Sequence, residues 1–219
     1  MTSSSPLNSA FFKELERLAF VVAGTYEALK VFEAVEIRVD KLNVARKGRA
    51  FGYIQQLAID RMLICIGKAT SKRNDDVSFR SLAKEIGRKR CVNVGVIRRH
   101  LTSERRSCEG RKDSECVDIF VKRLSEFKEE PFNRLKMARD KLIAHADRTA
   151  NWNDIGATFP DVEMFIAVAS SRIDSCFRAY IDGVSAGASL YAICRQHAEK
   201  NIRAQIELVE LALQTVAEQ

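Results

Sequence analysis

The sequence has no long apolar run, and it contains little proline, glycine or histidine. The longest apolar run, residues 18–23, is far shorter than the ~20 residues that a membrane-spanning helix needs. Residues 1–6 lack the basic region and apolar stretch that begin a signal peptide. We therefore expect a cytoplasmic protein with no membrane partner.

The six cysteines also exclude some classes of protein, because none of them forms a Cys-x-x-Cys pair. A zinc site and a disulfide framework both usually show paired or regularly spaced cysteines. We interpret these residues as reduced thiols of a reducing compartment and expect no metal and no cofactor.

The residues that are abundant favour helix. Only three prolines and ten glycines interrupt a chain rich in Ala, Leu, Glu, Lys and Arg. The apolar fraction of 46% with 30% charged residues is typical of a folded globular chain. We predict a single domain over residues 1–219.

Apolar residues recur at helical spacing along most of the chain. Short polar, proline or glycine-containing segments separate these stretches, so the predicted fold is all-α, an antiparallel helical bundle with a basic arm. Residues 88–113 are ambiguous, because Val92, Val94 and Val96 alternate as in a strand, but an isolated strand lacks a partner; we favour a helix or a loose arm. The predicted helices span about 8–43, 51–65, 78–87, 114–127 (capped by Ser114), 131–145, 161–183 and 185–218.

Positive charge is concentrated in one segment. Residues 72–112 contain thirteen Lys or Arg and five Asp or Glu, which accounts for a local charge of +8. Such a stretch indicates a polyanion partner, usually nucleic acid, although a solvated segment without a partner would look the same. We expect His100 to be a solvated part of this arm. The candidate RNA contacts are Arg88, Lys89, Arg90, Arg98, Arg99, Arg105 and Arg106, with Lys141 further along the chain.

Arg139 and His145 lie on either side of Leu142 in the helix predicted to end near residue 145. On a continuous α-helix their backbones would be roughly 9 Å apart along the axis and about 120° apart around it. Both would then lie at the edges of the packed face, and a two-fold axis would bring two Arg-His pairs into one cleft.

That pair has the chemistry for cleaving RNA without a metal. A His with an ordinary pKa of ~6.5 can take a proton from a ribose 2′-OH or give one to the leaving 5′-oxygen. An Arg can hold phosphate oxygens through two hydrogen bonds, and Asp140 could orient either side chain. The alternative is a surface Arg and a helix-terminal His that serves only the helix end.

The segment Arg139-Asp-Lys-Leu-Ile-Ala-His145-Ala-Asp147 resembles the Arg-x4–6-His signature of HEPN domains. Together with Thr158-Phe-Pro-Asp161 and Val77-Ser-Phe-Arg-Ser-Leu82, it is similar to the abortive-infection U branch of HEPN proteins, over roughly residues 50–180. In one variant of the signature a Tyr follows the His by two residues and is modified by a partner enzyme. Asp147 occupies that position here, so we do not expect that control.

The resemblance implies a helical, dimerising, metal-independent endoribonuclease of a toxin–antitoxin or phage-defence system. Arg139, His145 and Asp140 would be its catalytic residues, RNA its substrate, and an antitoxin protein a further partner. Its products would carry a 2′,3′-cyclic phosphate and a 5′-OH. Two other hypotheses are a non-catalytic helical module that binds RNA or a protein, and a purely structural helical dimer.

Overall fold

The computed structural model describes residues 10–44, 48–73, 77–89, 93–103, 108–144, 156–180 and 187–217. Within these ranges all regular structure is helical, which confirms the predicted all-α fold. The elements are α1 (Ala10–Glu36), α2 (Val39–Val44), α3 (Gly48–Ala69), α4 (Phe79–Lys89), α5 (Val94–Ser103), α6 (Asp113–Ser125), α7 (Glu130–Arg139), the π-helix η2 (Asp140–Ala144), α8 (Phe159–Tyr180) and α9 (Leu190–Ala217).

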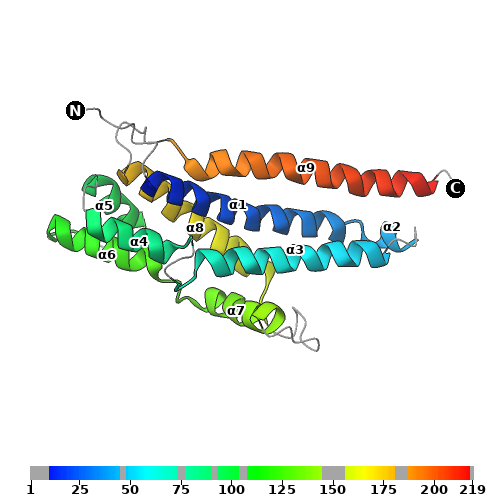
Figure 1. Ribbon diagram of the computed structural model, residues 1–219, viewed down its shortest axis with the longest axis horizontal. Helices are drawn as coiled ribbons and strands as arrows, with labels where there is room; N and C mark the ends of the chain where they lie inside the picture. Colours follow the sequence, from blue (N-terminus) through cyan, green and yellow to red (C-terminus); the bar gives the residue numbers. More distant parts are fainter. Residues whose placement is uncertain are drawn as a thin grey trace.

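Helix α1 lies at the centre of the bundle, and the long helices α3, α8 and α9 pack around it. α3 and α8 run antiparallel to α1, whereas α9 runs in the same direction (Figure 1). The short helices α4, α5 and α6 gather at one end of the bundle, and α7 packs against α3 and α8. None of the helices in the described ranges is long and apolar enough to cross a membrane.

The central position of α1 follows from its sequence. Leu15, Leu18, Val22 and Leu29 are essentially inaccessible to solvent, and small residues lie between them. Small side chains let neighbouring helices approach, and a Cβ added to Gly24 would lie only 3.4 Å from Cys65 Sγ of α3. Because α1 carries apolar and small residues on several faces, three long helices can pack around it.

One buried carboxylate joins three of the long helices, α1, α3 and α9. Glu27 of α1, 4% exposed, accepts hydrogen bonds from Arg61 of α3 at 2.9 and 3.1 Å. Gln205 and Asn201 of α9 also donate to this carboxylate, at 3.1 and 3.4 Å. A buried charge with several donors is stable, and here it fixes the relative position of α1, α3 and α9.

The prediction that His100 belongs to a solvated arm is wrong. Its ring is buried, lies 2.8 Å from Ser175 Oγ through Nδ1 and meets the ring of Phe120 edge-on. Residues 94–103 of the ambiguous segment form helix α5, one of the two forms favoured above, and its periodicity turns Ile97, His100 and Leu101 toward α6 and α8. The alternation of valines around residue 94 therefore did not indicate a strand.

Other boundaries also differ from the predicted ones. The first predicted helix is two helices, α1 and α2; α1 ends at Glu36, and the side chain of Arg38 donates to the carbonyl of Ala34 in its last turn. Ser114 is not a cap: α6 begins after Lys112, whose side chain makes no cap hydrogen bond. α8 begins at Phe159 rather than Asp161.

Candidate active site

The helix that carries Arg139 starts as the sequence predicts. Pro131 lies in the first turn of α7, where its missing N–H is tolerated. Phe132, Leu135 and Ala138 are buried at helical spacing and pack α7 onto the bundle. Arg139, the next residue, therefore lies at the edge of the packed face, as expected.

After Arg139 the helix widens into the π-helix η2. The N–H of Asp140 bonds to the carbonyls of both Lys136 and Met137, and the wider turn continues to Ala144. The continuous α-helix that was assumed for the offset between Arg139 and His145 is therefore interrupted at Asp140. Insertions of π geometry are frequent at functional sites. His145 lies just outside the described residues.

Two neighbours fix the side chain of Arg139. Asp140 Oδ1 accepts a hydrogen bond from Arg139 Nε at 2.9 Å and another from Nη2. On the other side lies Gly67 of α3, where an added Cβ would be only 2.6 Å from Arg139 Cδ. A guanidinium has five N–H groups, so the bonds to Asp140 leave donors for a phosphate.

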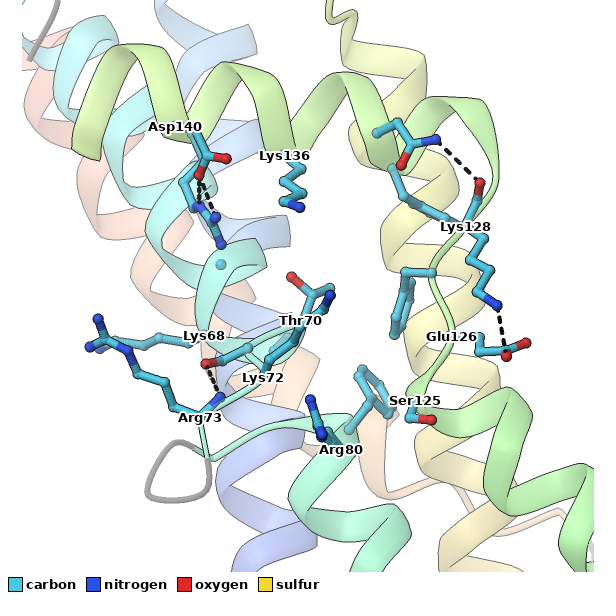
Figure 2. Close-up of a pocket in the computed structure, with 18 of the residues that line it drawn as sticks. Lys68, Thr70, Lys72, Arg73, Arg80, Ser125, Glu126, Lys128, Lys136 and Asp140 are labelled. Atoms are coloured by element: carbon cyan, nitrogen blue, oxygen red, sulfur yellow. Dashed lines mark hydrogen bonds and ion pairs between the residues drawn. The ribbon is translucent and has the colours of Figure 1, made fainter. Parts of the chain in front are cut away.

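A cleft of about 870 Å³ opens beside Arg139, between α7 and the ends of α3 and α4. Figure 2 shows Lys136 on α7 and Arg80 on α4 pointing into it from opposite walls. Such a volume is in the range of ligand-binding pockets, about 300–1,000 Å³. The cationic side chains that line the cleft are Lys68, Lys72, Arg73, Arg80, Lys128, Lys136 and Arg139.

The cleft is electropositive. Among the described residues of the lining, seven cations face two carboxylates, Glu126 and Asp140, which gives these residues a net charge of +5. Each carboxylate already binds a cation of the lining: Glu126 accepts from Lys128 Nζ at 3.0 Å, and Asp140 binds Arg139. Lys128 also lowers the pKa of Glu126, so this pair stays ionised at neutral pH. The other cations can attract an anion.

The back wall of the cleft is rigid. The ring of Phe127 lies 5.2 Å from those of both Phe79 and Phe132, centroid to centroid. The guanidinium of buried Arg172 lies 4.3 Å from the centre of the Phe127 ring and donates to the carbonyl of Glu126 at 3.0 Å. This packing holds residues 126 and 127 against α8 and so fixes the shape of the cleft.

The predicted RNA contacts whose side chains the structure describes do not line this cleft. Arg88 and Arg99 are exposed on α4 and α5, and Lys141 is exposed on η2. Arg98 instead serves the fold, since it donates to the carbonyls of Cys108 and Arg111 and to Asp113. The structure places Lys89 at the end of α4 but does not describe its side chain. Arg90, Arg105, Arg106 and His145 lie outside the described residues.

Sequence reasoning missed Gly67, Lys68 and Lys136. Lys136 precedes Arg139 by three positions, which places both on one side of a helix, and that spacing was the available signal. Nothing in the sequence indicates that residues 67–80 and 126–140 form one cleft. In the described residues no three His, Cys, Asp or Glu side chains form a group that could hold a metal ion.

A comparison with protein-family models matches residues 9–198 to the family HEPN_AbiU2, described as AbiU2. The chain belongs to the HEPN AbiU2 family. The match includes the Arg139–His145 motif and every element that lines the cleft, and it extends beyond the residues 50–180 that carried the resemblance. Searches of curated proteins and of solved structures find no match.

Proposed function

We propose that this HEPN AbiU2 protein is a metal-independent endoribonuclease that acts as a toxin or a phage-defence component in the cytoplasm. The observation that carries the proposal is Arg139, the first residue of the motif, held by Asp140 at an electropositive cleft. A guanidinium fixed in this way is suited to hold the phosphate that is attacked.

In the proposed reaction the ribose 2′-oxygen attacks the adjacent phosphorus. A bond forms between phosphorus and the 2′-oxygen, and the bond to the 5′-oxygen breaks. His145 takes the proton of the 2′-OH or supplies the proton of the leaving oxygen, as its motif position implies. Arg139 stabilises the negative charge that builds on the phosphate. The products are a 2′,3′-cyclic phosphate and a 5′-OH.

We also propose a homodimer that places two such clefts near a two-fold axis. Tyr53, Leu57 and Ile64 are exposed on α3 at spacings that put them on one face, and Ile64 reaches the lining of the cleft. An exposed apolar stripe of this kind is typical of an interface. In a toxin system an antitoxin protein would be a second partner.

The experiment is RNA cleavage in EDTA by the wild-type protein and by His145→Ala, with analysis of the product ends. The proposal predicts cleavage by the wild type, cyclic phosphate ends, and no cleavage of 2′-O-methyl RNA. The His145→Ala variant is expected to lose at least about a hundredfold in rate. Equal rates for both proteins, or products with a 2′-OH and a 5′-phosphate, would contradict the mechanism.

The second candidate is an RNA-binding module that does not cut. The charge of the cleft favours it, because five net positive charges attract RNA whatever His145 does. It predicts salt-sensitive RNA binding that is the same in the wild type and in His145→Ala, with intact RNA recovered from both.

A further inference from the structure

The cleft presents cations from two separate walls. Arg80 lies near the start of α4 and Lys136 on α7, and their charged ends point toward the space between the walls (Figure 2). Arg139 follows Lys136 by three positions, so both side chains leave the same side of α7. An RNA strand that enters the cleft between Arg80 and Lys136 would therefore meet Arg139 next.

These cations are available for an anion. No carboxylate in the described residues lies within ion-pair distance of Arg80, Lys136 or Lys72. The two acids of the lining are each bound to another cation, Lys128 or Arg139. Within the described ranges, positive charge on both walls therefore has no carboxylate partner, which is the arrangement that a polyphosphate backbone neutralises.

The lining also has neutral polar groups. Thr70, Ser71, Ser125 and Asn133 line the same space, and hydroxyl and amide groups commonly contact phosphate and sugar oxygens. The aromatic residues beneath them are packed against each other, so the wall offers a fixed surface. Cations along two walls with few carboxylates suit a flexible chain of phosphates better than a single anion.

We propose that single-stranded RNA runs through this cleft, with backbone phosphates held between Arg80 and Lys136 and the phosphate to be cut at Arg139. The site takes Lys72, Arg73 and Arg80 from the basic segment, residues 72–112, but not the part of that segment in α5, which packs on α6 and α8 at the far end of α4 (Figure 1). The proposal deepens the proposed nuclease function and rests on it for the position of the phosphate that is cut.

The test measures binding without cleavage. Fluorescence anisotropy follows a labelled 2′-O-methyl oligouridine, which has no free 2′-OH to attack, binding to the wild-type protein over a range of salt concentrations. The variant Arg80→Gln/Lys136→Gln is compared with Arg17→Gln/Lys13→Gln, which removes one Arg and one Lys from exposed positions on α1. Thermal unfolding checks that both variants fold.

The expected result is weaker binding of at least about tenfold for the cleft variant and less than about twofold for the matched control. The slope of log affinity against log salt should fall by about 0.7 for each cation removed from the cleft. An unchanged slope and affinity in the cleft variant, or a larger loss in the control, would overturn the proposal.

Two further outcomes are decisive. Uridine monophosphate that competes at the same concentration as the oligonucleotide would show a nucleotide pocket and overturn the strand proposal. A wild-type protein that binds the oligonucleotide through the cleft but leaves unmodified RNA intact supports RNA binding here and rejects the nuclease, so the two failures are distinguishable.

Discussion

Arg139 is fixed by two neighbours that act in different ways. Asp140 supplies hydrogen bonds that orient the guanidinium, and Gly67 supplies the space in which the side chain crosses α3. An arginine has many rotamers, so holding it before RNA binds reduces the entropy that binding must overcome. Both neighbours therefore matter for catalysis in the proposed reaction, even though neither need touch the substrate.

The first prediction concerns Gly67. In Gly67→Ala the new methyl group would lie 2.6 Å from Arg139 Cδ, so the side chain must move away from its position beside Asp140. We expect cleavage to fall about tenfold or more, because small misplacements of catalytic groups are costly. Single-turnover RNA cleavage, with circular dichroism to confirm helix content, measures this.

Gly52→Ala on the same helix is the matched control, since nothing lies within 4 Å of its added Cβ. Alanine is a better helix former than glycine, so both variants gain about 0.5–1 kcal/mol of helix propensity. The control should cut RNA at the wild-type rate. Equal rates for Gly67→Ala and the wild type would show that Gly67 does not position Arg139.

At this scale the sequence identified Arg139 and Asp140 but not Gly67. The motif places the first two next to each other, whereas Gly67 meets Arg139 only because α3 and α7 cross. His100 shows the same limit, since its basic neighbours suggested solvent and the packing of α5 buries it. A contact between distant helices leaves no local pattern to detect.

At the scale of elements, most helices could be predicted because their apolar residues repeat at helical spacing. Two helix ends differ from the prediction. At the end of α1, Arg38 donates to the carbonyl of Ala34, and after α7 the π-helix η2 replaces the last predicted α-helical turn. A π-helix has no distinctive composition, so the widened turn before His145 could not be predicted.

The second prediction concerns the start of α8. Arg134 of α7 donates to both carboxylate oxygens of Asp161, at 3.0 and 2.5 Å, and the N–H of Thr158 donates to the same carboxylate at 2.9 Å. The carboxylate of Asp161 thus makes one of the two bonds of a capping box and also links α7 to α8. We expect Asp161→Asn to lower the Tm by about 2–4 °C at about pH 6.

The effect should depend on pH in a defined direction. Arg134 lowers the pKa of Asp161 below its usual value of 3.8, so the stabilisation is complete above that value and is lost as the pH falls through the lowered pKa. The difference between the wild type and Asp161→Asn should therefore shrink between about pH 5 and about pH 2. A constant difference across that range would exclude the ionised carboxylate as its cause.

At the scale of the whole molecule, the concentration of charge proved informative but incomplete. The basic segment, residues 72–112, divides in space: Lys72, Arg73 and Arg80 line the cleft, whereas Arg98 binds the start of α6. The other cations of the described lining are Lys68, Lys128, Lys136 and Arg139. The sequence thus predicted a positively charged surface without its location, because the location depends on how the helices pack.

The third prediction concerns the dimer. Leu57→Glu places a charge in the exposed apolar stripe of α3, and we expect it to give a monomer that no longer cuts RNA, because a buried unpaired charge destabilises an interface. Analytical ultracentrifugation gives the mass. Leu208→Glu, an equally apolar and exposed site on α9, is the control and should remain dimeric. Dissociation of the control alone would place the interface on α9.

Single-turnover cleavage of unmodified RNA in EDTA by Arg139→Ala tests most directly whether the cleft is the site of catalysis. Arg17→Ala, an exposed arginine of α1 that does not line the cleft, is the control. We predict a loss of at least about a hundredfold for Arg139→Ala and a wild-type rate for Arg17→Ala. Cleavage by Arg139→Ala at the rate of the control would contradict a catalytic role for the cleft.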